Sequence, residues 1–137
     1  MMFTDAELEY MRTQQLGRLS TIGADGGPQT RPVSFRAYED GTILIGGPDN
    51  ETTAKYKNVR ARPRVSFVVD DLMPEGPDEI KPGFGRGVEV RGRAEVVTLD
   101  ESPIAPGFFS NEWIRIHAER VISWQLERDR EIYSRSV

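Results

Sequence analysis

The fold is decided by a predicted β-hairpin at residues 16–37, which read LGRLSTIGADGGPQTRPVSFRA. Leu16–Ile22 and Thr30–Ala37 are rich in apolar and β-branched side chains, and they flank the turn-forming sequence at residues 24–27, Ala-Asp-Gly-Gly. Two antiparallel strands joined by a tight turn are therefore expected near the start of the chain.

A short helix is predicted before the hairpin. Thr4 is followed three residues later by Glu7, which is the capping-box pattern of a helix start, and Gly17 is a suitable C-terminal stop. We expect this helix at residues 5–15.

Mostly strands are predicted after the hairpin. A second short helix is expected at residues 52–60, ended by Pro63, and Gly92 is expected to mark a bulge. Residues 71–86, rich in proline and glycine, are expected to form a long loop. The further predicted strands are Thr42–Gly46, Arg64–Asp70, Gly87–Val97, Ile114–Ile116 and Val121–Leu126. Hairpin connections and few helices favour a mainly β antiparallel barrel, built as one domain over residues 1–137.

Composition excludes several kinds of chemistry. The chain has 137 residues, of which 37% are hydrophobic, and shows neither an apolar run of membrane-spanning length nor a signal-peptide pattern, so we expect a cytoplasmic protein without a membrane partner. It has no cysteine and one histidine, His117, which argues against thiolate catalysis and against a metal site. We expect His117 to lie at a turn, either in a structural role or merely exposed. Difficult chemistry is therefore assigned to a bound cofactor.

Positive charge is concentrated in one segment, although the net charge is −4. Residues 55–64 contain five bases and no acid, which leaves 13 bases against 22 acids elsewhere. Proteins that bind long nucleic acids usually spread basic residues over a face, whereas a local cluster suits a small phosphorylated ligand. The five bases are Lys55, Lys57, Arg60, Arg62 and Arg64.

The start of the predicted second helix is a candidate phosphate site. A helix N-terminus offers free backbone N–H groups, and nearby lysines add charge. Lys55 and Lys57 are the main candidates, with Thr52 and Thr53 as hydroxyl donors, and we expect neither lysine to be buried. From the residues alone, the alternative is that the lysines form a solvated helix face.

Three segments in order resemble the flavin/deazaflavin split-barrel family, often called pyridoxamine-phosphate-oxidase-like. They are residues 16–35, which form the hairpin, residues 46–66, which include TTAKYKNV at 52–59, and residues 90–124, which include VRGRAEV at 90–96 and AERVISW at 118–124. The match spans most of the chain.

The resemblance implies a split antiparallel β-barrel with a few short helices that forms a homodimer, with the cofactor in a groove at the interface. It assigns cofactor contacts to Arg31, Pro32, Val33, Ser34, Gly46, Thr52, Thr53, Lys55, Lys57, Asn58 and Trp124. Other roles stay open: an interface ion pair for Arg31, an edge position for Pro32, a cap for Asn58 and core packing for Trp124.

The implied activity is hydride transfer between a bound deazaflavin, coenzyme F420, and a small organic substrate, with no residue named as catalytic. The short chain and the segment at residues 82–92 favour F420 over flavin mononucleotide (FMN), and Arg60 and Arg62 suit the oligoglutamate tail of F420. The alternatives are an FMN-dependent oxidoreductase or flavin carrier of the same family. A non-enzymatic alternative is a small β-barrel that binds single-stranded nucleic acid, for which Tyr56 and Phe67 are the nearby aromatic residues.

Overall fold

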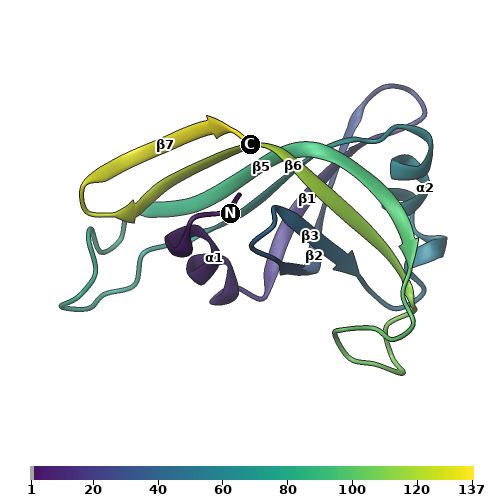
Figure 1. The fold of residues 1–137 in the computed structure, drawn as a ribbon, viewed down its shortest axis with the longest axis horizontal. Helices are drawn as coiled ribbons and strands as arrows, with labels where there is room; N and C mark the ends of the chain where they lie inside the picture. The colour runs from purple at the N-terminus through teal and green to yellow at the C-terminus, as the bar shows by residue number, and fades with distance from the viewer. Residues whose placement is uncertain (1) are drawn as a thin grey trace.

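The computed structural model describes residues 2–137, which form seven strands and two α-helices (Figure 1). In chain order the elements are α1 (Asp5–Arg12), β1 (Leu16–Ile22), β2 (Pro28–Ala37), β3 (Thr42–Gly46), the 3-10 turn η1 (Asn50–Thr52), α2 (Ala54–Ala61), β4 (Arg64–Leu72), β5 (Gly85–Thr98), β6 (Glu112–Glu127) and β7 (Arg130–Ser136).

The strands form one antiparallel sheet that closes on itself. Its order is β3-β2-β1-β4-β5-β6-β7, and β3 also pairs with β6, so six strands make a barrel and β7 extends β6 outside it. The hairpin is formed with Leu16 opposite Ser34 and Ile22 opposite Pro28. The mainly β split-barrel fold expected from the sequence is confirmed.

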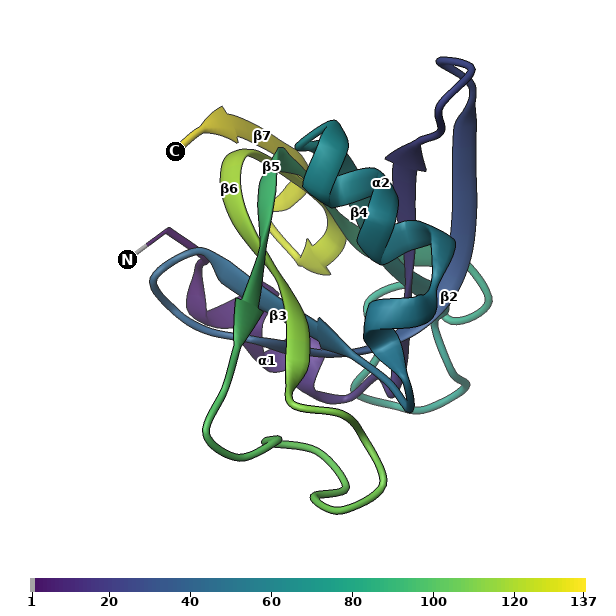
Figure 2. The same ribbon diagram turned by 90° about the vertical axis from the view of Figure 1, so that its right-hand side faces the viewer.

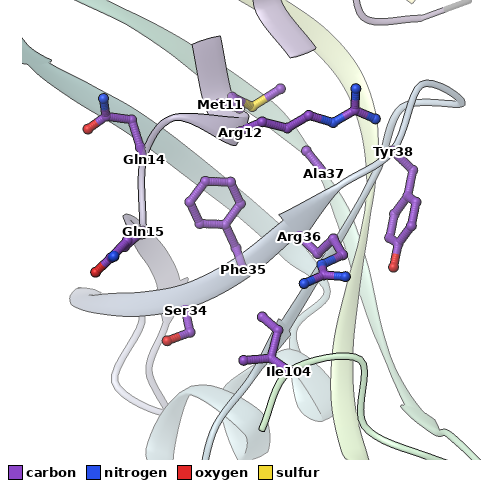
Figure 3. A pocket seen from close by; sticks show the side chains of 10 residues that line it. All are labelled: Met11, Arg12, Gln14, Gln15, Ser34, Phe35, Arg36, Ala37, Tyr38 and Ile104. Carbon is purple, nitrogen blue, oxygen red and sulfur yellow. The ribbon is translucent and has the colours of Figure 1, made fainter. Parts of the chain in front are cut away.

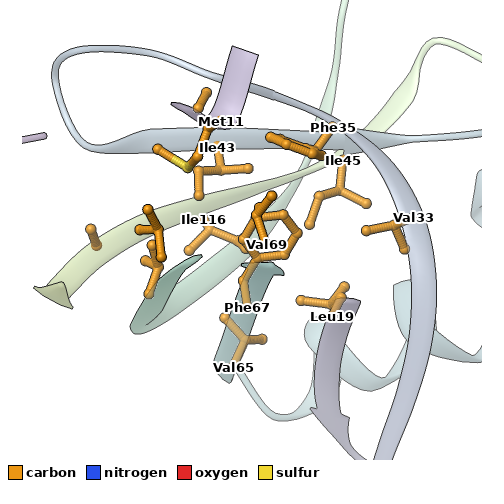
Figure 4. Packing of buried hydrophobic residues seen from close by; sticks show 14 of the residues in the cluster. Met11, Leu19, Val33, Phe35, Ile43, Ile45, Val65, Phe67, Val69 and Ile116 are labelled. Carbon is orange, nitrogen blue, oxygen red and sulfur yellow. The ribbon is translucent and has the colours of Figure 1, made fainter. Parts of the chain in front are cut away.

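The barrel interior is a continuous apolar core whose shape explains one glycine (Figure 4). Phe67 of β4 is 1% exposed and packs edge-on against Phe35 of β2, with ring centroids 5.1 Å apart. A Cβ atom at Gly17 would collide with the Phe67 ring. Gly17 is therefore needed inside β1 for packing, and the prediction that it ends the first helix was wrong.

Helix α1 is shorter than predicted, and its start has the predicted cap. It ends at Arg12, and the Thr13 N–H bonds back to the carbonyls of Met11 and Tyr10. The capping box is present: the Glu7 N–H donates to the Thr4 hydroxyl, and the Glu7 carboxylate accepts from the Thr4 N–H.

Strands β5 and β6 are long and bend together at a bulge. Arg91 pairs with Arg120 and Gly92 with Ala118, so Glu119 is the extra residue. A Cβ atom at Gly92 would collide with the His117 carbonyl oxygen, which is why glycine stands there. The bulge is where Gly92 predicted it, although the unpaired residue belongs to β6.

The structure differs from the sequence-based expectation at four places in the second half of the chain. The segments expected as two strands, Ile114–Ile116 and Val121–Leu126, are one strand, because pairing with β5 continues across the bulge. Strand β7 was not predicted, and it forms because β6 offers it a free edge. His117 lies within β6 opposite Thr42 rather than at a turn. The loop expected at residues 71–86 is limited to 73–84, because β4 and β5 pair up to Leu72 and Gly85.

Helix α2 lies beside the projecting β1–β2 hairpin (Figure 2). It covers residues 54–61, close to the predicted 52–60, and follows η1 directly. In the part of the chain that the structure describes, no helix has the length and apolar character needed to cross a membrane.

Candidate functional site

The two candidate lysines lie on different faces of α2. Residues two apart on a helix are separated by about 200° around its axis. Lys55 is half-buried, whereas Lys57 is exposed. The expectation that neither lysine is buried agrees with the structure, although Lys55 is partly covered where it lies between α2 and the hairpin.

A small pocket lies at the N-terminus of α2, with a volume of about 170 Å³. It brings together residues from β1, β2 and the start of the helix, and its charged groups, Arg31 and Lys55, are both basic. The lining residues are Leu19, Thr21, Gln29, Arg31, Pro32, Thr53, Ala54 and Lys55.

Backbone donors add to this positive charge. Thr53 is the N-cap of α2: its hydroxyl accepts from the Tyr56 N–H at 3.4 Å and donates to the Asn50 carbonyl at 2.7 Å. The amides of Ala54 and Lys55 begin the helix, and no acceptor for them is found within residues 2–137. Two free N–H groups thus border the pocket that Lys55 enters.

The electrostatics of the pocket favour an anion. Burial lowers the pKa of Lys55 below its ordinary value, and the positive charge of Arg31 lowers that pKa further. The Arg31 guanidinium donates to the neighbouring Thr30 carbonyl at 3.4 Å, and no acid of the described chain forms an ion pair with either base. Free amides and two bases without a counter-ion fit a phosphate group.

Asn58, predicted to contact the cofactor or to act as a cap, holds α2 against the hairpin within the chain. The residue is 7% exposed, and its side-chain amide donates to Thr21 Oγ1 at 3.0 Å and to Gln29 Oε1 at 2.9 Å. Arg62 makes a similar tie, because its Nε donates to the Ile22 carbonyl at 2.8 Å. Both residues fix the walls of the pocket from outside it.

Strand alternation separates the predicted ring contacts on β2. Val33 points into the core and is 4% exposed, so its side chain is unavailable to a ligand. Pro32 is exposed and borders the α2 pocket. Ser34 lines a different and larger pocket.

Gly46 and Thr52 have structural reasons for being where they are. A Cβ atom at Gly46 would collide with the ring of Trp113, a fully buried residue whose position the sequence left open. Thr52 donates its hydroxyl to the Asp49 carbonyl at 2.8 Å, which closes the turn before α2. Neither residue lines the α2 pocket.

Trp124 lies far from α2 within one chain. It is half-buried opposite Gly87 and pairs with Ile132 of β7. The β6–β7 hairpin and α2 stand at opposite ends of the long axis of the molecule (Figure 1). A contact between Trp124 and a ligand at α2 therefore requires a second copy of the chain.

A second and larger pocket, about 730 Å³, was not anticipated (Figure 3). It extends from the C-terminal end of α1 across β2 to the loop that precedes β6. The outward alternation of Ser34, Arg36 and Tyr38 could have indicated a polar face, but the approach of α1 and of the loop had no local signal. Its lining residues are Met11, Arg12, Gln14, Gln15, Ser34, Phe35, Arg36, Ala37, Tyr38 and Ile104.

Tyr56 and His117 are held by carboxylates. The Tyr56 hydroxyl donates to Glu112 at 3.1 Å, and the residue is 5% exposed, so it packs rather than reaching a substrate. His117 Nε2 lies 2.9 Å from a Glu95 carboxylate oxygen. No group of three His, Cys, Asp or Glu side chains arranged to hold a metal ion is found in residues 2–137.

Comparisons with known proteins agree with this architecture. The family model described as pyridoxamine 5′-phosphate oxidase matches residues 3–125. The chain is 39% identical over 130 residues to 5a,11a-dehydrotetracycline/5a,11a-dehydrooxytetracycline reductase of Streptomyces rimosus, covering 94% of this chain and 87% of the reductase.

Two less similar proteins also match most of this chain. The chain is 29% identical over 118 residues to pyridoxine/pyridoxamine 5′-phosphate oxidase of Chromobacterium violaceum, covering 86% of this chain but 47% of the oxidase. The crystal structure of a conserved hypothetical protein from Mycobacterium tuberculosis superposes with a TM-score of 0.64 at 26% identity, covering 92% of this chain and 87% of that one.

Proposed function

Because the chain belongs to the pyridoxamine 5′-phosphate oxidase family, a family of oxidoreductases, we propose that it transfers a hydride between coenzyme F420 and a small organic substrate. The observation behind this proposal is the α2 pocket, where Lys55 and Arg31 face free helix amides without a counter-ion. These groups would hold the cofactor phosphate, and the bound deazaflavin would supply the hydride chemistry.

The relative from Streptomyces rimosus is named as a reductase and matches almost the whole chain, which supports reduction of a substrate with either cofactor. The exposed charges of α2 support F420 over FMN. Lys57 and Arg60 are exposed on the same short helix, outside the pocket, where an acidic oligoglutamate tail would find positive charge. Arg62 contributes less than predicted, because its guanidinium is engaged with the hairpin.

The rest of the cofactor is too large for the α2 pocket of about 170 Å³. We place it along the exposed face of β2 beside Pro32, where a second subunit would complete the groove. A homodimer would let Trp124 reach this groove from the partner, because the β6–β7 hairpin of the same subunit lies at the opposite end from α2. The chain's own residues would bind, orient and exclude water.

A nucleic-acid-binding function is less well supported. Stacking on bases requires accessible aromatic rings next to the basic segment. Tyr56 is 5% exposed and Phe67 is 1% exposed, so neither ring offers a platform.

The test is a titration of the purified protein with F420, FMN and a short single-stranded oligonucleotide, each followed by fluorescence. F420 is expected to bind in a saturable manner and more tightly than FMN. Lys55→Ala should weaken F420 binding about tenfold, since one charge-assisted contact to phosphate is lost. Lys81→Ala is the matched control and should change affinity by less than about threefold, because Lys81 is exposed in the loop before β5, where it lies near Glu131 rather than α2.

A turnover assay separates an enzyme from a flavin carrier. Oxidation of reduced F420 would be followed with a panel of unsaturated substrates that includes 5a,11a-dehydrotetracycline, the compound in the name of the Streptomyces relative. Tight F420 binding without oxidation of any substrate would favour a carrier. Binding of FMN alone would replace F420 by FMN, and binding of the oligonucleotide alone would refute the proposal.

A further inference from the structure

The pocket of about 730 Å³ between α1 and β2 lies outside the α2 cradle and has its own binding chemistry. Its volume is within the range that holds a drug-sized ligand. Ser34 borders this pocket and Pro32 borders the cradle, so the two cavities follow one another along the same strand. A ligand here would lie next to a cofactor held at α2.

Two arginines give this pocket its charge. Arg12 comes from the last turn of α1 and Arg36 from the outer face of β2 (Figure 3). In the described chain neither guanidinium makes a hydrogen bond or an ion pair, although acids outnumber bases 22 to 18 in the sequence. By contrast, Arg86, Arg91, Arg130 and Arg135 are each bound to a carboxylate within 2.8 Å. No acidic side chain lines the pocket, which therefore favours an anion.

The strand edge adds polar groups at a fixed position. The Tyr38 N–H bonds to the Thr42 carbonyl, so even-numbered residues of β2 bond to β3 and Ala37 directs its N–H and carbonyl to the opposite side. Pairing with β1 ends at Ser34, and no backbone partner for Ala37 is found on that side within residues 2–137. One donor and one acceptor are thus available beside α1.

The remaining walls are apolar. Phe35 and Met11 are 9% and 1% exposed, and they form a floor fixed by the core. Ile104 reaches the pocket from the loop before β6, on the side of β2 away from α1 (Figure 3). An apolar floor in a pocket whose charged groups are both guanidinium groups suits a ligand that combines a flat hydrocarbon body with an acidic group.

We propose that this pocket binds planar, largely apolar molecules that bear a carboxylate or an equivalent anion, with Arg12 and Arg36 as the specificity-determining residues. That such molecules are the substrate class of the enzyme rests on the proposed function; the binding itself does not. Gln14 and Gln15 border the same pocket from the α1–β1 connection and supply further amide groups.

The test uses a matched pair of probes, 2-naphthoate and the neutral 2-naphthylmethanol, titrated into the cofactor-free protein and followed by naphthalene fluorescence. Naphthoate is expected to bind at least about tenfold more tightly than the alcohol, because it gains charge-assisted hydrogen bonds. The double variant Arg12→Gln, Arg36→Gln should remove this preference. Arg128→Gln is the control for loss of an arginine charge outside the pocket, because Arg128 is exposed and bonds to the Asp78 carbonyl, and it should leave the preference intact.

Two results would overturn the proposal: naphthoate that fails to saturate, and a preference for naphthoate that survives in the double variant. A circular dichroism melt of each variant verifies folding. F420 titration of the same double variant keeps the two proposals separate. In the double variant, unchanged F420 binding with lost naphthoate preference supports both proposals. In the wild type, naphthoate binding without F420 binding refutes only the proposed function, and F420 binding without naphthoate binding refutes only this inference.

Discussion

The two ends of the molecule treat buried charge in opposite ways. At the α1–β7 end, the Glu7 carboxylate is 1% exposed and accepts hydrogen bonds from Ser123 and from both terminal nitrogens of Arg135, at 2.7–2.9 Å. At the α2 end, Lys55 is half-buried beside Arg31 without any acid. The first charge is neutralised by the chain itself, and the second is left for a ligand.

This difference separates structural from functional charge. A buried ion pair whose hydrogen bonds are all made stabilises a particular arrangement, here the joining of the N-terminal helix to the C-terminal strand. A half-buried cation next to a like charge costs folding free energy, so its presence is explained better by binding. The predictions below test this contrast on the free energy of unfolding, from the largest change to the smallest.

Loss of Arg135 should have the largest effect. Arg135→Met leaves the Glu7 carboxylate buried without its main partner and should reduce the free energy of unfolding by about 3–5 kcal/mol, measured by urea denaturation. Arg130→Met is the matched control. Arg130 also lies on β7 and over the Tyr133 ring, but its partner Glu127 is exposed to solvent, so little change is expected. Equal effects would contradict a structural role for the Glu7 pair.

Loss of Asn58 should have an intermediate effect. Asn58→Ala leaves the buried Thr21 hydroxyl without a donor and should cost about 1–3 kcal/mol in the same measurement. Asn111→Ala is the control, because Asn111 donates to the Asp100 carbonyl at an exposed position. F420 binding should weaken in Asn58→Ala, since the hairpin is no longer fixed against α2; unchanged stability would show that the amide bonds are dispensable.

Acid should weaken the α1–β7 end selectively. Burial raises the pKa of Glu7, but hydrogen bonds from Arg135, Thr4 and Ser123 outweigh it, so the pKa lies below its ordinary value of 4.5. A carboxyl with a lowered pKa stabilises the folded state above the unfolded pKa, and this stabilisation is lost as pH falls through the folded pKa. The urea concentration at the unfolding midpoint, measured from pH 7 downward, should therefore begin to decrease below about pH 4.5. Glu7→Gln should be less stable at neutral pH and show a weaker acid dependence; a parallel profile would assign the effect to other carboxyls.

Loss of Lys55 should have the smallest effect on the protein without ligand. Lys55→Ala removes a desolvated charge beside Arg31, so the free energy of unfolding should stay within about 0.5 kcal/mol or increase slightly. Saturating F420 should then raise the melting temperature of the wild type more than that of Lys55→Ala, because a ligand that binds the folded state stabilises it in proportion to its affinity. Strong destabilisation of the variant would make Lys55 a structural residue.

Local patterns were sufficient for the first half of the fold. The turn at residues 24–27 and the flanking apolar residues define β1 and β2, and the capping box defines the start of α1. Such signals are local because they depend on backbone conformation and on side-chain alternation over a few residues. Strand β7 lacked a comparable signal, because its pairing with β6 provides the stability that its own sequence does not indicate.

The sequence predicted the kind of site, but not which residues line it. A basic segment at a helix start indicated an anion site, and Lys55 and Arg31 do meet in one pocket. Lys55 enters the pocket and Lys57 does not, because the two residues lie on different faces of α2. Asn58 is engaged in hydrogen bonds because the hairpin places Thr21 and Gln29 next to it. Those distinctions depend on how the helix is oriented against the sheet.

The sequence by itself determined the hairpin, the antiparallel β architecture and a concentrated positive charge that suits a phosphorylated ligand. Only the tertiary structure decided which charges are free. Glu7 and Arg135 are 128 residues apart and neutralise each other, whereas Lys55, Arg31, Arg12 and Arg36 remain without acids in two pockets. The physical reason is that the free energy of a charge depends on its neighbours and its solvation, which are set by packing between distant segments.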